Sequence, residues 1–119
     1  MTHNKLIELA RAYIALSNAH HIEHILSMFA AGASYHSTTV GDHRGRAAIA
    51  DMMHEFFTRH ADVYWQADNY RCDDHRVSFD FTMTADGEEL RRSGVEHLDF
   101  TADGSIKKVT VESGSQDAS

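Results

Sequence analysis

The first half of the chain carries apolar side chains at helical spacing. Between Leu6 and Ser17 they recur every three or four positions, which predicts a helix with a broad buried stripe. The same spacing returns over Ile22–Phe29 and over Arg46 to about His60. We expect Gly32 to stop the second helix and residues 41–45 to form a loop. The sequence therefore predicts three helices in its N-terminal half.

The second half changes to an alternation of apolar and polar residues, which is typical of strands with one buried face. Asp86-Gly87 and Asp103-Gly104 have the composition of tight hairpin turns, so the later strands are expected to form an antiparallel meander. The β-branched and aromatic residues of 33–40 predict one earlier strand. The four strands of the second half are expected at Val63–Tyr70, Val77–Thr84, Glu89–Phe100 and Ile106–Ser113.

Helices first and strands later indicate an α+β fold in which the helices cover one face of a curved sheet. A chain of 119 residues is expected to fold as a single domain, here residues 1–113. Residues 114–119 are expected to form a disordered tail.

Charge and composition exclude several kinds of partner. The chain has 11 basic and 18 acidic residues and a net charge of −7, which disfavours nucleic acid and anionic membrane surfaces. Its apolar stretches are too short to span a bilayer. The single cysteine, Cys72, cannot form an internal disulfide, and the first residues lack the order of a secretory signal. These features predict a cytoplasmic location.

The alternation also places an acid inside the fold. Leu98 and Phe100 are expected to face inward, and Glu96 must face inward with them because side chains repeat every second residue. A carboxyl group among apolar side chains loses hydration, which raises its pKa unless a cation stands nearby. Glu96 is thus a candidate for proton chemistry, or it is paired with Arg92 or solvated at the open end of the sheet.

An apolar pocket is expected around Glu96. Tyr13 lies in the apolar stripe of the first helix, where its hydroxyl either faces this pocket or bonds a backbone carbonyl. The predicted substrate-binding wall consists of Phe56, Trp65, Phe79, Phe81, Met83, Leu98, Phe100 and Val109, with an interface position on the convex side as the alternative for Trp65.

Several short segments together match a known superfamily in their order and spacing: Tyr13-Ile14-Ala15 with Asn18-Ala19, Met28-Phe29-Ala30, Gly45 before Ala47-Ala48-Ile49, and Val95-Glu96-His97-Leu98 with Phe100 ahead of Gly104. With the order of elements, they resemble the nuclear transport factor two-like superfamily, and within it the SnoaL-like and ketosteroid isomerase-like proteins. The resemblance implies a cone-shaped, mixed or antiparallel sheet wrapped by three N-terminal helices, a cystatin-like α+β barrel. It also implies a homodimer formed through the convex face of the sheet.

The resemblance also implies roles for single residues. The oxyanion-hole tyrosine of the ketosteroid isomerases matches Tyr13, and their neutral carboxylic acid matches Glu96. Their general-base carboxylate falls on Ser37, whose hydroxyl cannot hold a proton at neutral pH. If the strand register shifts by one residue, His36 enters the pocket instead and could serve as the base.

Two functions follow as expectations. The first is an isomerase-like or lyase-like enzyme in which Glu96 and Tyr13 transfer a proton to, or stabilise an oxyanion on, a small hydrophobic carbonyl-type substrate without a cofactor. The second is a non-catalytic protein that binds a small hydrophobic metabolite. The spacing of His20, His21 and His24 could suggest a metal site, but these residues are better interpreted as a solvated helix face, and no metal is expected.

Overall fold

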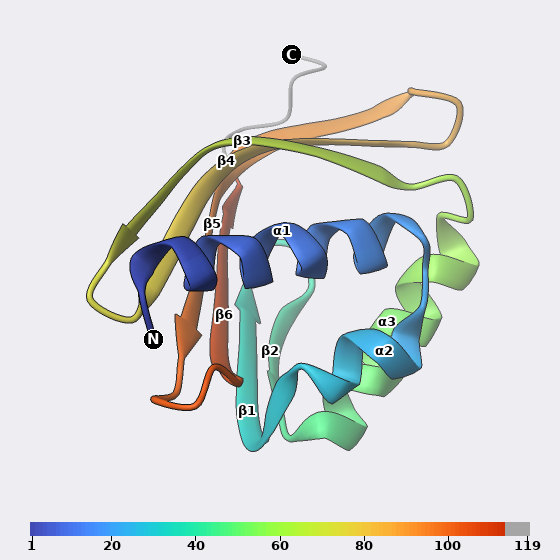
Figure 1. Cartoon of the computed structure of the whole chain (residues 1–119). Helices are drawn as coiled ribbons and strands as arrows, with labels where there is room; N and C mark the ends of the chain where they lie inside the picture. Colours follow the sequence, from blue (N-terminus) through green and yellow to red (C-terminus); the bar gives the residue numbers. More distant parts are fainter. Residues whose placement is uncertain (114–119) are drawn as a thin grey trace.

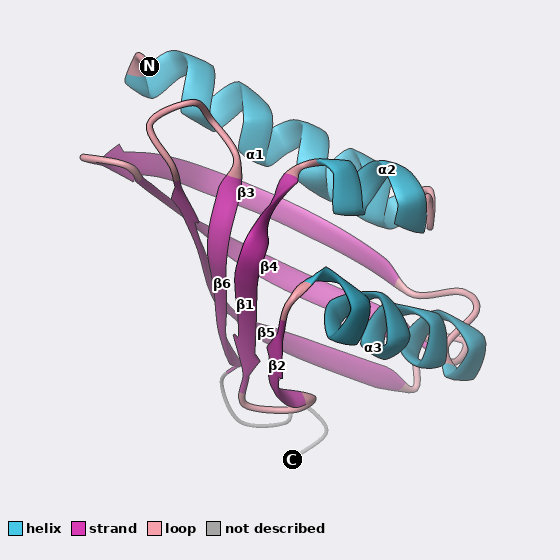
Figure 2. Cartoon of the chain, turned by 90° about the horizontal axis from the view of Figure 1, so that it is seen from below, coloured by secondary structure: helices cyan, strands magenta, loops and turns pink. Residues whose placement is uncertain are grey.

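Three helices pack against one face of a curved sheet, as predicted, and the sheet has six strands where five were expected (Figures 1 and 2). The structure is a computed structural model and describes residues 1–113; the predicted tail at 114–119 lies outside the described residues. The helices are α1 (His3–Asn18), α2 (Ile22–Ser27) and α3 (Arg46–Arg59). The strands are β1 (Phe29–Ser37), β2 (Gly41–Arg44), β3 (Tyr64–Asp73), β4 (Arg76–Ala85), β5 (Leu90–Phe100) and β6 (Ile106–Ser113).

The strands follow the order β2-β1-β6-β5-β4-β3 in space. Among the described strands, β1 and β6 form the only parallel pair, and the other neighbouring strands are antiparallel. Strand β6 comes back to pair with β1 after the chain has passed through β3, β4 and β5. The sheet is therefore mixed, and Figure 1 shows α1 lying within its curve. The α+β class is confirmed.

Helix α1 starts earlier than its apolar pattern suggests. Thr2 caps it, since its side-chain oxygen accepts a hydrogen bond from the backbone N–H of Lys5 at 3.1 Å. Its buried side follows the predicted stripe and includes Leu6, Tyr13 and Ser17.

No helix within residues 1–113 is long and apolar enough to cross a membrane.

The segment between α2 and α3 departs most from the sequence-based prediction. Helix α2 ends at Ser27 and β1 begins at Phe29, so Gly32 lies inside a strand and does not stop a helix. The predicted loop over 41–45 contains β2, which pairs antiparallel with β1. A four-residue polar strand shows no apolar alternation, and only its backbone pairing with β1 defines it.

The meander agrees closely with its pattern. Every second residue of β4 is buried, and the register sets these side chains beside those of β5 on the inner face. Asp86 and Gly87 have positive φ angles of 57° and 67°, as the predicted tight turn requires. The outer face of these four strands carries mostly polar side chains, so the core lies between the inner face and the helices.

Candidate active site

Glu96 is the acidic residue at the centre of the site. It lies on β5, directly opposite Phe79 of β4 and Val111 of β6, and its side chain points to the inner face. Only 4% of its surface is exposed. Burial among apolar neighbours raises its pKa to about 8 because the charged form loses its hydration. At neutral pH the carboxyl group is therefore mostly protonated and can donate a hydrogen bond.

Two phenols accompany this acid. Tyr13 comes from α1 and is buried, whereas Tyr35 comes from β1 and is partly buried. Burial raises the pKa of both hydroxyls above the ordinary value, and the negative charge that Glu96 carries when ionised raises them further. Both phenols thus stay protonated at physiological pH and remain hydrogen-bond donors.

Local contacts hold Tyr13 in place. Its ring stacks on Phe29 at the start of β1, with centroids 6.0 Å apart. One turn later in the helix, Ser17 is also buried, and its hydroxyl donates to the backbone carbonyl of Tyr13 at 2.8 Å. This bond satisfies the only polar group of the Ser17 side chain within the apolar stripe.

Two adjoining cavities meet at Glu96. The inner cavity extends under α1 and α3, and the outer cavity extends toward the loop after β1. The two cavities share Tyr35, Met52, Phe56, Trp65 and Glu96. The inner cavity adds Tyr13, Ile14, Ser17, Met53 and Phe57. The outer cavity adds Ser37, Thr39, Val40, Phe81, Met83, Arg92, Val111 and Ser113.

Trp65 is fixed between the cavities by a side chain of α1. The Asn18 amide accepts from the backbone N–H of Trp65 at 2.7 Å and donates to its carbonyl at 2.9 Å. This pair of bonds imitates a strand pairing and joins the end of α1 to β3. The indole ring then lies beside Phe56, with centroids 6.2 Å apart, and forms an aromatic wall.

The sequence pattern of the SnoaL-like domain matches residues 10–109, most of the chain. The chain belongs to the SnoaL-like family. No curated protein matches the sequence significantly. Several solved structures share its fold. Their sequence identities to this chain are low, so the likeness supports a common fold and nothing further.

Three solved structures illustrate the range of this fold. A protein of unknown function with a cystatin-like fold from Methylobium petroleophilum PM1 is 19% identical, with a TM-score of 0.84 and coverage of 97% of this chain and 79% of that one. A provisionally assigned ketosteroid isomerase from Kribbella flavida DSM 17836 is 20% identical, with a TM-score of 0.82 and coverage of 95% and 80%. The epoxide hydrolase/cyclase-like enzyme SalBIII, with a role in pyran ring formation in polyether salinomycin, is 20% identical, with a TM-score of 0.80 and coverage of 93% and 92%.

The residues expected to form the pocket wall of this SnoaL-like domain fall into two groups: some line the cavities, and the others are buried in the core behind them. Trp65 and Phe56 line both cavities, and Phe81 and Met83 line the outer one. The other four are packed into the core and border neither cavity: Phe79, Leu98, Phe100 and Val109. The alternation of apolar and polar residues predicts which face of the sheet a side chain lies on. It does not predict whether that side chain reaches a cavity or stays in the core. Phe79, for example, packs on Tyr70, with ring centroids 5.0 Å apart.

The register of β1 sets Ser37 toward the cavity and His36 away from it. Ser37 lines the outer cavity, and its oxygen accepts from the backbone N–H of Thr39 at 3.1 Å. His36 faces Asp42 of β2, and the Nδ1 of its ring lies 2.9 Å from an Asp42 carboxylate oxygen. The shifted register that would bring His36 into the pocket is therefore not the one observed.

Tyr35 was missed at the sequence level although a signal was present. Its neighbour two positions on, Ser37, was already assigned to the inner face, and alternation places Tyr35 on that face too. A phenol two residues before Ser37 is therefore a pocket candidate on the sequence pattern alone.

The three histidines near α2 do not gather into one group. His20 precedes the helix, its ring stacks on Phe57 at 4.3 Å, and its Nε2 lies 3.1 Å from the Val63 carbonyl. His21 and His24 are exposed. Across residues 1–113, no cluster of three or more His, Cys, Asp or Glu side chains could hold a metal ion.

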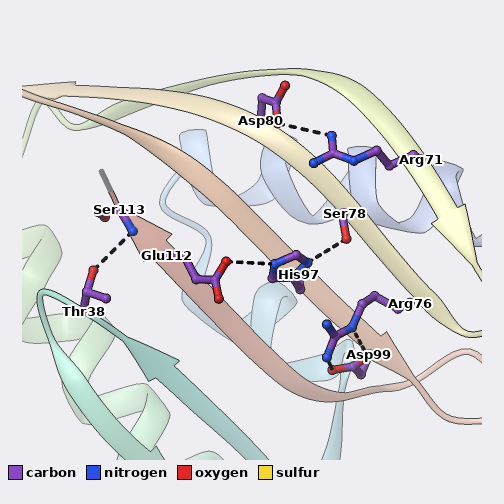
Figure 3. Close-up of polar contacts among 9 residues, drawn as sticks. All are labelled: Thr38, Arg71, Arg76, Ser78, Asp80, His97, Asp99, Glu112 and Ser113. Atoms are coloured by element: carbon purple, nitrogen blue, oxygen red, sulfur yellow. Dashed lines mark hydrogen bonds and ion pairs between the residues drawn. The ribbon is translucent and has the colours of Figure 1, made fainter. Parts of the chain in front are cut away.

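The outer face of the sheet carries a separate polar network (Figure 3). His97 on β5 lies 2.6 Å from the Ser78 hydroxyl through Nδ1 and 3.3 Å from Glu112 through Nε2. Because a carboxylate only accepts, Nε2 carries a proton and, in the neutral ring, Nδ1 accepts from Ser78. Arg76 and Asp99 form a two-point ion pair on the same face, at 2.8 and 3.0 Å.

Proposed function

We propose that the protein is an enzyme that acts on a small, largely apolar molecule bearing a carbonyl-type oxygen. The observation that carries this proposal is a single buried acid, Glu96, enclosed by apolar walls and accompanied by the phenols of Tyr13 and Tyr35. Strongly perturbed acids gather at functional sites, and Glu96 has a pKa near 8. The provisionally assigned ketosteroid isomerase and the epoxide hydrolase/cyclase-like enzyme that share the fold support chemistry of this kind.

In this proposal Glu96 and Tyr13 act as two fixed donors. The protonated carboxyl of Glu96 and the hydroxyl of Tyr13 donate hydrogen bonds to the substrate oxygen as negative charge develops on it. A pKa near 8 also lets Glu96 release and regain a proton near neutral pH. The reaction is isomerase-like or cyclase-like, and it needs no cofactor.

The test begins with native mass spectrometry, which identifies the ligand retained after purification, and continues with turnover of that ligand. Glu96→Gln and Tyr13→Phe should each slow turnover by about a hundredfold or more, the usual effect of losing such a group. Glu112→Gln and Tyr64→Phe serve as matched controls because both residues are exposed, and they should leave the rate unchanged. Unchanged rates in the Glu96 and Tyr13 variants would refute the assignment.

One observation favours a second function, the binding of a hydrophobic metabolite without chemistry. The oxygen of Ser37 is engaged by the backbone of the loop that follows it, and the resemblance to the ketosteroid isomerases puts Ser37 where they carry their general base. Recovery of the retained ligand unchanged after long incubation would support binding, whereas conversion supports catalysis.

We further propose that two copies pair through the convex face of the sheet, and that the protein works in the cytoplasm. The resemblance to ketosteroid isomerases supports the dimer, and the half-buried polar side chains of β4 and β5 supply the face it would use. The lone free thiol of Cys72 suits a reducing compartment. Sedimentation as a monomer at micromolar concentration would contradict the dimer.

A further inference from the structure

Arg92, a positively charged residue, borders the outer cavity and comes from the same strand as Glu96. Arg92 lines this cavity and lies on the same face of β5 as Glu96, since their cross-strand partners on β4 are Met83 and Phe79. Gly94 lies midway between them along the strand, opposite Phe81. A strip of β5 thus carries a guanidinium, a residue without a side chain, and a carboxylic acid.

The length of this strip fits a small molecule. Four residues of strand separate the Arg92 and Glu96 Cα atoms by about 13 Å. The long arginine side chain can shorten the gap between the two polar groups, and Gly94 adds no side chain between them. A ligand with its carbonyl oxygen at Glu96 can therefore extend along the outer cavity toward Arg92.

Resting on the function proposed above, we propose that the substrate is an apolar keto acid whose carboxylate is bound by Arg92 in the outer cavity. Arg92 is then a specificity-determining residue. Its guanidinium can bind a carboxylate through two parallel hydrogen bonds. A guanidinium has five N–H donors, so Arg92 can hold the ligand while keeping contacts within the protein.

The other groups of the outer cavity are compatible with an anion. Tyr35, Ser37, Thr39 and Ser113 border it with neutral polar groups, and apart from Arg92 and Glu96 its other lining residues are largely apolar. Glu96 has its pKa raised to about 8, so at pH 7 it is mostly neutral and does not repel a carboxylate. Arg92 is accordingly the group that sets the charge preference of this cavity.

The experiment compares two ligands that differ in charge alone. The probes are 3-benzoylpropionate, which has a phenyl ring, a ketone and a carboxylate, and its primary amide. Trp65 is the only tryptophan in the chain and lines both cavities, so its fluorescence reports binding. At pH 7 the acid should bind at least about tenfold more tightly than the amide, as a charge-assisted bond implies.

Variants assign the preference to its side chain. Arg92→Gln should abolish the preference, and Arg92→Lys should retain part of it. Arg91→Gln is the matched control, because it removes the same charge from the exposed neighbouring position of β5 and should keep the preference intact. Circular dichroism of each variant checks that it is folded.

The outcomes separate this inference from the proposed function. Equal binding of the two probes, or a preference that survives in folded Arg92→Gln, overturns the role of Arg92 and leaves the enzyme proposal standing. Failure of both probes to bind at millimolar concentration overturns the keto-acid substrate class. Loss of turnover in the Glu96 and Tyr13 variants is measured independently with the retained ligand and tests the proposed function alone.

Discussion

Glu96 and His97 are consecutive residues of β5 in opposite environments. Glu96 faces the helices, is 4% exposed, and has its pKa raised to about 8 by burial. His97 faces away from them and has two polar partners, Ser78 and Glu112 (Figure 3). A strand sends neighbouring side chains to opposite faces, so one residue along the chain separates the two.

The difference shows that the two faces of the sheet treat charged groups differently. The outer face joins its charged groups in pairs, as in the Arg76–Asp99 contact, which favours their ordinary charged states. The inner face surrounds one acid, Glu96, with apolar groups. These groups disfavour its charged form, so its protonation state changes near neutral pH.

The largest effect is expected on the pH dependence of stability. Below pH 4.5 Glu96 is protonated in both states, whereas between pH 4.5 and 8 the unfolded chain releases this proton and the folded protein retains it. The folded state then binds more protons, so stability falls as pH rises through this window. The total loss by pH 9 is on the order of 4 to 5 kcal/mol.

Urea unfolding at pH 5, 7 and 9 measures this loss. Glu96→Gln should remove most of the decline, and His97→Gln should keep it. The window avoids the acid range, where Asp62, Asp80 and Asp103, whose pKa values are lowered by hydrogen bonds, lose their stabilising effect as pH falls. A wild-type protein equally stable at pH 5 and pH 9 would contradict the burial of Glu96.

The next pair on β5 should differ in packing energy. Leu98 is fully buried opposite Val77 and Val109, so Leu98→Ala should cost about 2 to 5 kcal/mol. Asp99→Ala removes a partly exposed ion pair with Arg76 and should cost about 1 kcal/mol or less. Comparable losses of unfolding free energy in the two variants would show that the faces are not divided as described.

Much of this division could be predicted from the sequence. Period-two alternation grouped Glu96 with Leu98 and Phe100, and all three are buried. That inference needs only local geometry, because the side-chain direction in a strand is fixed by its backbone. The α+β class followed in the same way from the change of period along the chain.

Depth and pairing could not be predicted from the same pattern. Phe79 and Phe81 share a face, yet of the two only Phe81 lines the outer cavity, since the depth of a side chain depends on how the helices cover the sheet. Strand β2 has no alternation to detect and exists through its pairing with β1. Both features depend on residues distant in sequence.

A smaller loss of stability is expected at Gly94, where β5 lies close against β6. A Cβ atom added there would collide with the Glu112 carbonyl oxygen and lie 2.7 Å from the Ser113 Cα, so backbone would have to move. Gly94→Ala should cost about 1 to 3 kcal/mol. Gly32 in β1 is the control, because a Cβ atom there meets nothing within 4 Å. Thermal unfolding of the two variants gives the comparison directly.

The smallest effect is expected for the hydrogen bond between His97 and Ser78. The bond is part-buried and only 2.6 Å long, so a double-mutant cycle of His97→Gln and Ser78→Ala should give a coupling of about 0.5 to 1.5 kcal/mol. Turnover of the retained ligand should not change in either variant, because both side chains point away from the cavities. A rate loss above about tenfold in folded His97→Gln would mean that the outer face controls the chemistry next to it on β5, and the separation of the two faces would no longer hold.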